Sequence, residues 1–155
     1  MEQGMTWQEL LDARQIRPHQ TIAEELFDLR AIIERDLADA KVTDISPDRR
    51  FATAYNAVLQ TTKLVLACAG YRVVGLGHHQ TTFAALGLAL GPMPFPYDSY
   101  FDGCRKKRNR VEYDMANIAT MGEVDELITL AEKFRESVEG WIRITHPAYA
   151  VQRSR

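Results

Sequence analysis

The spacing of hydrophobic residues along the chain predicts helices almost everywhere. After Pro18, apolar side chains recur every three or four residues as far as about Lys41, and Thr21 is placed to cap the helix that they form. These positions lie on one stripe of the helix and leave its acidic side chains to water; they are Ile22, Leu26, Leu29, Ile33 and Leu37. The stripe predicts a helix that packs on a core along one side.

The next helix is predicted to run from the Ser46-Pro47 pair to about Gly70, because serine favours the cap position and proline the first helical position. Small and large apolar residues surround this helix, including Phe51, Ala54, Tyr55, Ala57, Val58, Leu59, Val65, Leu66 and Ala67. A helix that is apolar around most of its circumference belongs at the centre of a bundle.

Shorter patterns complete the bundle. A capping box of Thr6 and Glu9 opens a first helix that reaches Arg14, and another helix runs over residues 79–90 until Gly91 ends it. A fifth helix begins near Tyr97 or Asp98 and reaches about Asn117.

A second capping box, Thr120 with Glu123, opens the last helix, whose inward positions are Leu127, Leu130, Phe134, Val138 and Trp141. The tail from His146 is expected to fray, and the strand candidate at residues 71–74 has no visible partner. The pattern therefore predicts an all-α bundle of four to five main helices plus a short N-terminal helix, in a single domain over residues 1–155 with its core at about 20–145.

Composition agrees with an ordinary globular protein. The chain has 155 residues, of which 46% are hydrophobic and 26% charged. Its first residues lack the basic and apolar regions of a signal peptide, so a soluble, cytoplasmic protein is expected. Cys68 and Cys104 are too few for a disulfide framework or a zinc site and are expected to be reduced packing residues.

Charge changes this picture, because the formal net charge of −2 hides a segregation. Residues 24–44 hold seven acidic and three basic side chains, and residues 123–139 hold six acidic and two basic. Between these acidic segments, five of the six residues 105–110 are basic: Arg105, Lys106, Lys107, Arg108 and Arg110. Such a segment attracts anions of the kind that a phosphate backbone presents, although a basic run is also typical of a solvated helix face.

Arg108 stands out within this segment because it occupies an apolar slot in the stripe Phe101, Cys104, Arg108, Val111, Met115 and Ile118. Burying an unpaired guanidinium costs several kcal/mol, so Arg108 must find a partner, reach water or bind an anion. Glu112, four residues on, is a candidate partner. Arg105, Arg108, Asn109 and Glu112 share one side of the helix, where they would suit a phosphate clamp.

With these residues, the sequence resembles the HEPN superfamily, the higher eukaryote and prokaryote nucleotide-binding domains. The similarity covers roughly residues 20–145 and is carried by the alanine-rich central helix, by the segment GHHQTTFAAL and by the motif RNRVEYD at residues 108–114. It implies an all-α, HEPN-like bundle that dimerises, and for many members a metal-independent ribonuclease whose two motifs meet in one cleft. That motif is an arginine, often followed by a polar residue, and a histidine four to six residues later.

Arg108 and Asn109 match the arginine and its polar neighbour, but Tyr113 stands at the histidine position, with Asp114 behind it. Histidine suits proton transfer because its pKa is about 6.5, whereas a tyrosine of pKa about 10 is a poor base that can still donate a hydrogen bond. His78 and His79 either form a polar turn or place one imidazole in the cleft. No metal and no cofactor are expected.

Three hypotheses follow. The first is a HEPN-type endoribonuclease, or the toxin component of a toxin–antitoxin or defence system, with catalytic Arg108, Asn109 and Tyr113 and with RNA bound by the other basic residues of the segment. The second is an inactive helical dimer that binds RNA, a nucleotide or a partner protein through the basic helix. The third is a scaffold in which Arg108 only pairs with Glu112.

The partners that go with the first two hypotheses are a second copy of the chain, RNA or a nucleotide, and a cognate antitoxin such as a minimal nucleotidyltransferase; no membrane is expected. Tyr97, Tyr100, Phe101 and the PMPFP loop supply aromatic and apolar material of the kind that a dimer interface favours.

Overall fold

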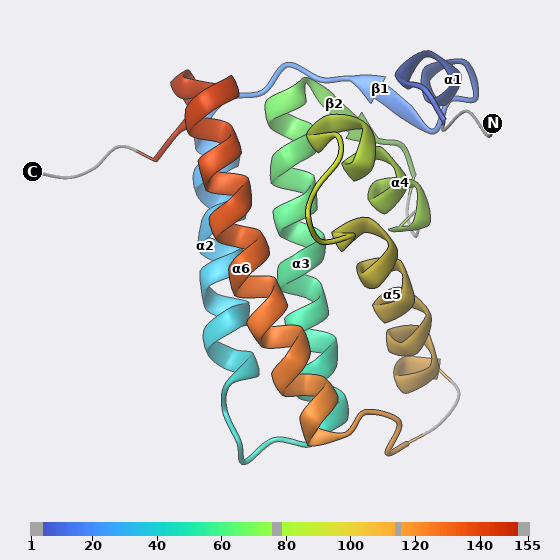
Figure 1. Cartoon of the computed structure of the whole chain (residues 1–155), viewed down its shortest axis with the longest axis vertical. Helices are drawn as coiled ribbons and strands as arrows, with labels where there is room; N and C mark the ends of the chain where they lie inside the picture. The colour runs from blue at the N-terminus through green and yellow to red at the C-terminus, as the bar shows by residue number, and fades with distance from the viewer. Residues whose placement is uncertain (1–4, 76–78, 114–115, 152–155) are drawn as a thin grey trace, which may run out of the picture.

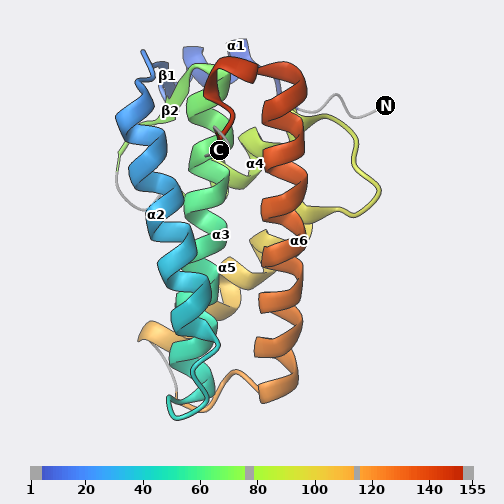
Figure 2. The same ribbon diagram turned by 90° about the vertical axis from the view of Figure 1, so that its left-hand side faces the viewer.

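Three long helices form the body of the molecule, in a computed structural model that describes residues 5–75, 79–113 and 116–151, with the backbone alone at 111–113. α2 (Ala23–Ala40), α3 (Pro47–Ala69) and α6 (Met121–Thr145) run side by side in Figures 1 and 2. α4 (His79–Leu90) and α5 (Tyr97–Tyr113) pack on the remaining side of α3. The all-α bundle is confirmed.

The centre of this bundle is α3, which contacts α2, α4, α5 and α6. Its start follows the predicted chemistry, because the Ser46 hydroxyl accepts a hydrogen bond from the backbone N–H of Arg49 at 3.2 Å and Pro47 takes the first turn. Its end is capped by Gly70, whose φ of +90° lies in the left-handed region that glycine adopts without strain. The predicted capping box of Thr120 and Glu123 also forms at the start of α6.

One predicted helix cap is wrong. Thr21 does not cap α2, because its hydroxyl donates to the carbonyl of Ala67 on α3 and Ile22 takes the cap position instead. The fifth helix, predicted to reach about Asn117, is described as far as Tyr113, and residues 114–115 lie outside the described residues. Asn117 has a left-handed φ of +61°, so the helix has ended by this residue.

The strand candidate does have a partner. β2 (Tyr71–Val73) pairs antiparallel with β1 (Ile16–Pro18), Ile16 opposite Val73, and the rings of Trp7 and Tyr71 stack with centroids 4.4 Å apart. The strand pairing and the ring stack hold the short α1 (Trp7–Asp12) at the end of the bundle where β1 and β2 lie (Figure 1).

The tail after α6 is docked as well, contrary to the expected fraying. η1 (Pro147–Tyr149) brings the carbonyl of Tyr149 to Nη2 of Arg30 at 2.8 Å, and Trp141 packs edge-on against His146. Hydrogen bonding and ring packing therefore order this segment.

Aromatic side chains fill the core where α5 meets α6. Phe101 and Phe134 are completely buried, with centroids 5.0 Å apart, and Tyr97 packs on both. The suggestion that Tyr97 and Phe101 belong to a dimer interface is therefore wrong, because the chain's own core covers them. Cys68 and Cys104 are buried and reduced, and in the described part of the chain no helix is long and apolar enough to cross a membrane.

Gly87 of α4 lies close to a side chain of α5. A methyl group at Gly87 would lie 3.2 Å from Oδ2 of Asp98 in the first turn of α5. That separation is tighter than an ordinary van der Waals contact, so a side chain at Gly87 would displace the Asp98 carboxylate by a few tenths of an ångström.

Asp48 ties the segment that follows α5 to the start of α3. Its two carboxylate oxygens accept hydrogen bonds from the backbone N–H groups of Asn117, Ile118 and Ala119, at 2.6, 2.9 and 2.8 Å. One side chain thus satisfies three donors that lie about 70 residues away in sequence.

We expect Asp48→Ala to lower the free energy of unfolding by about 2 kcal/mol, because hydrogen bonds to a charged group are lost and backbone donors lose their acceptor. Urea denaturation checks this. Asp44→Ala, a carboxylate removed from an exposed position in the nearby loop, is the matched control and should change stability by less than about 0.5 kcal/mol. Equal effects of the two substitutions would contradict the role of Asp48.

Candidate functional site

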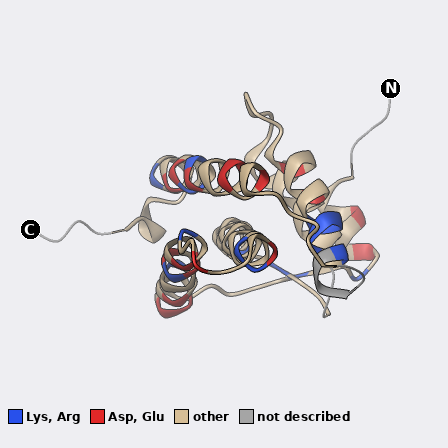
Figure 3. Cartoon of the chain, turned by 90° about the horizontal axis from the view of Figure 1, so that it is seen from below, with Lys and Arg blue, Asp and Glu red and all other residues tan. Residues whose placement is uncertain are grey.

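The basic segment 105–110 lies in the C-terminal half of α5, and some of its charges are neutralised within the chain. Nε of Arg105 donates to Asp102 at 2.7 Å, and Nζ of Lys106 lies 4.0 Å from the same carboxylate. Lys107 pairs with Glu123 of α6. Seen from below, the blue segments of α5 lie on the opposite side of the molecule from the C terminus (Figure 3).

Arg108 is directed onto the central helix. Its Cζ atom lies 5.8 Å from the centroid of the Tyr55 ring on α3, within the range of a cation–π interaction. This contact explains how an arginine occupies an apolar slot, because the face of an aromatic ring attracts the guanidinium and still contributes apolar packing. The planar guanidinium is the group best matched to a phosphate.

Tyr55 connects Arg108 to a histidine. The tyrosine is 1% exposed, and its hydroxyl lies 2.9 Å from Nδ1 of His79, the first residue of α4. A buried hydroxyl needs a hydrogen-bond partner, and this one finds it on a residue 24 positions later. Helices α3, α4 and α5 thus bring together Tyr55, His79 and Arg108.

The environment keeps the histidine neutral. Burial lowers the pKa of His79 below its ordinary value, and the positive charges of Arg108, Lys63 and Arg105 lower it further. Burial raises the pKa of Tyr55, even though Arg108 and Arg105 oppose the shift, so its hydroxyl keeps its proton. At neutral pH the site therefore presents a neutral imidazole beside a permanent cation.

The hydrogen bond to Tyr55 occupies one ring nitrogen of His79 and leaves the other ring nitrogen to contact a ligand. Since Nδ1 of His79 is engaged by Tyr55, Nε2 is the ring nitrogen that can meet a ligand. When Nδ1 carries the ring proton and donates to Tyr55, Nε2 has a free lone pair and can act as a base. When the Tyr55 hydroxyl donates to Nδ1, the ring proton is on Nε2, which is then a hydrogen-bond donor. Both states suit proton transfer.

The remaining predicted residues are distributed around this site. Asn109 is half-buried next to Arg108, and Arg110 is exposed. The side chains of Glu112 and Tyr113, together with Asp114 and His78, lie outside the described residues. The structure thus brings Arg108 and His79 together through Tyr55 and engages Arg105, Lys106 and Lys107 in ion pairs.

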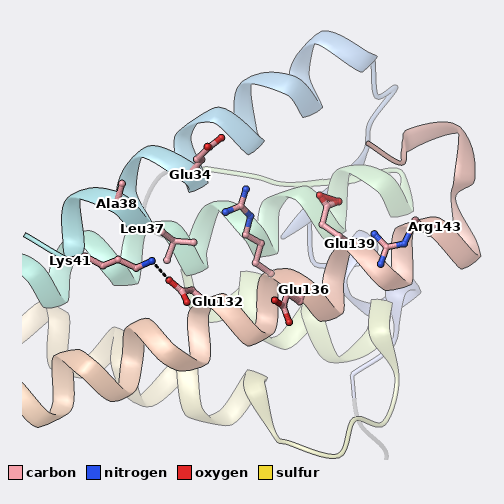
Figure 4. Close-up of a pocket in the computed structure, with 9 residues that line it drawn as sticks. Glu34, Leu37, Ala38, Lys41, Glu132, Glu136, Glu139 and Arg143 are labelled. Carbon is pink, nitrogen blue, oxygen red and sulfur yellow. Dashed lines mark ion pairs between the residues drawn. The ribbon is translucent and has the colours of Figure 1, made fainter. Parts of the chain in front are cut away.

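A groove of about 660 Å³ between α2 and α6 offers a contrast (Figure 4). It is lined by charges of both signs: Glu34, Glu132, Glu136, Glu139, Lys41, Arg135 and Arg143. Lys41 pairs with Glu132, and Arg30 donates two hydrogen bonds to Glu139, at 2.9 and 2.8 Å. Because these carboxylates and cations neutralise one another, the groove has no preference for an anion.

Comparison with known proteins gives no relative: no family model matches the chain, and no curated protein or solved structure matches it. Within residues 5–75, 79–113 and 116–151, no three His, Cys, Asp or Glu side chains gather in a way that could hold a metal ion.

Tyr55 is the site residue that sequence reasoning missed, because it was assigned to the core along with its apolar neighbours. A signal was present: tyrosine carries a hydroxyl, and a hydroxyl in the middle of an apolar helix must find a polar partner. The sequence could not show that the partner is His79, since the two residues meet only after α4 folds back on α3.

The lowered pKa of His79 predicts a pH dependence of stability. Because the unfolded chain takes up the proton more readily than the folded chain, His79 costs stability as the pH falls below about 6.5. His79→Gln removes this cost, so the variant should lose less unfolding free energy between pH 7 and pH 5 than the unaltered protein. Urea denaturation at both pH values checks this; identical pH slopes would contradict a neutral, buried His79.

Proposed function

We propose that the protein is a metal-independent endoribonuclease of the HEPN type, in which Arg108 binds the scissile phosphate and His79 transfers protons. The observation that carries the proposal is the connected group of Arg108, Tyr55 and His79, which supplies a cation and a neutral imidazole at one place. The family motif has its histidine on the same helix as the arginine; here α4 supplies the imidazole instead.

The reaction is cleavage of RNA by its own 2′-hydroxyl. As a base, Nε2 of His79 takes the proton of the 2′-OH while O2′ forms a bond to phosphorus. The bond from phosphorus to the 5′-oxygen then breaks, and that oxygen gains a proton, leaving a 2′,3′-cyclic phosphate and a 5′-hydroxyl. Arg108 stabilises the negative charge that grows on the phosphate oxygens, with Asn109 as a neighbouring hydrogen-bond donor.

A homodimer belongs to the same proposal, because the resemblance implies a composite cleft in which the sites of two protomers meet. In that cleft, the neutral His79 of one protomer would act as the base, and water would supply the proton that the leaving 5′-oxygen gains. A role as the toxin of a toxin–antitoxin or defence pair, restrained by a cognate antitoxin, is compatible with this activity. Sedimentation at micromolar concentration tests the dimer.

The activity is tested on single-stranded RNA in the presence of EDTA. We expect cleavage that EDTA does not inhibit, and a fall in kcat/KM of about a hundredfold or more for both His79→Gln and Arg108→Ala, because each removes a group that acts in the transition state. Tyr55→Phe, which removes only the hydroxyl that orients His79, should lower kcat more than it raises KM.

Lys133→Ala, an exposed cation removed from α6, is the matched control and should cleave like the unaltered protein. The acid limb of the pH profile should lie below the ordinary pKa of histidine, because the pKa of His79 is lowered. Full activity of His79→Gln or Arg108→Ala would refute the proposal. RNA binding that weakens with salt, without any cleavage, would instead identify an inactive binding protein.

A further inference from the structure

A second feature involves Arg108, which is one of the residues that line a groove of about 450 Å³. The last turns of α2, the loop that leads to α3 and the first half of α3 form the walls, and Arg108 reaches in from α5. The volume is within the range of sites that hold one small ligand. The site described above therefore continues into a concavity.

Three arginines and two aspartates line the groove, which leaves it a net charge of +1. Arg35 comes from α2, Arg49 from α3 and Arg108 from α5, so three helices each contribute one arginine to the lining. Arg35 and Arg49 are exposed, the side chain of Arg35 by 63%. Three guanidiniums around one concavity favour a ligand with phosphate oxygens.

The two carboxylates of the groove play different parts. Asp36 is 5% exposed and accepts hydrogen bonds from Nε of Arg35 at 3.0 Å and from Nδ2 of Asn56 at 2.6 Å. It is therefore a positioning residue that holds the Arg35 guanidinium. Asp39, one turn further along α2, is exposed and lines the groove, where a carboxylate accepts hydrogen bonds from hydroxyl groups.

Three apolar side chains also line the groove. Val42 and Ile45, in the loop between α2 and α3, are 44% and 39% exposed, and Ala52 of α3 also lines the groove. Exposed aliphatic side chains next to arginines suit a ligand that has a flat apolar part joined to a phosphate. A nucleotide has this construction, and its ribose adds hydroxyl groups between the two parts.

We propose that this groove binds the ribonucleotide adjacent to the scissile phosphate. Arg35 and Arg49 bind its own phosphate, its base packs on Val42 and Ile45, and its 2′-hydroxyl donates to Asp39. This inference rests on the proposed function, since Arg108 is shared between the groove and the scissile phosphate. The 2′-hydroxyl contact makes the groove selective for RNA over DNA.

The test measures binding separately from cleavage. His79→Gln protein, full length, is titrated into fluorescent single-stranded RNA and DNA of the same eight-nucleotide sequence, and anisotropy gives both dissociation constants. Adding Arg49→Ala should weaken binding of RNA and DNA alike by about tenfold and reduce the slope of log K against log salt by about one. Lys133→Ala, a cation removed outside the groove, is the matched control and should leave both constants unchanged.

Asp39→Ala tests the ribose contact. The parent should prefer RNA over DNA by about tenfold, and the substitution should bring this ratio to about one, even though removing a negative charge strengthens binding of both strands. Asp44→Ala removes the same charge from a nearby loop position outside the groove and should keep the ratio.

The two proposals can fail separately. If Arg49→Ala binds like Lys133→Ala, or if Asp39→Ala keeps the RNA preference, the groove is not the nucleotide site, whatever the cleavage assay shows. The groove proposal is also contradicted if the His79→Gln protein shows no preference for RNA over DNA, or if it binds neither strand at low salt. If the unaltered protein cleaves no RNA while both groove variants behave as expected, the groove proposal stands and the ribonuclease proposal fails.

Discussion

The arrangement of the bundle depends on the need to cover α3. Of its 23 residues 14 are buried, and they occupy most of the circumference of the helix. Only one side, which carries Ala52, Thr53, Asn56, Gln60 and Lys63, is partly open to water. α2, α6, α4 and α5 together supply that cover. Each covering helix needs only one apolar stripe, and its other side is available for charge. The charged residues of the covering helices can therefore gather on their outer sides.

Burying a whole helix also means burying its polar groups, and each of these requires a partner. Arg50 is 4% exposed; its Nε donates to the carbonyl of Ala40, and its Nη2 lies 3.6 Å from Asp125. Thr61 and Thr62 donate to carbonyls one turn back on their own helix. Tyr55 has no such local solution and turns to α4. The polar contacts of α3 thus fix how its neighbours are placed, in addition to apolar packing.

The parts of the fold that were predictable from the sequence are those determined by local chemistry. Ser46 and Thr120 cap their helices as expected because the hydroxyl and the N–H groups that it satisfies lie within one turn. Thr21 also carries a hydroxyl, but this hydroxyl donates to the carbonyl of Ala67 on α3. Because that carbonyl comes from another helix, the contact is not evident from the sequence near Thr21. The pairing of β1 with β2 was hidden because each strand has three residues and one includes Pro18.

The candidate site divides in the same way. Arg108 was noticeable in the sequence because it breaks a regular pattern, and a broken pattern is a local signal. The roles of Tyr55 and His79 depend on helices that meet through tertiary packing, so no spacing rule could relate them. The α2–α3 groove was even less predictable from the sequence, since its lining comes from three helices and a loop.

The missing side chain at Gly87 bears on how α5 begins. A methyl group at this position would lie 3.2 Å from Oδ2 of Asp98, so the carboxylate would have to shift by a few tenths of an ångström. The other oxygen of that carboxylate accepts a hydrogen bond from the backbone N–H of Ser99 at 2.9 Å, in the first turn of α5. A larger residue at Gly87 would therefore disturb a contact at the start of the helix that carries Arg108 near its other end.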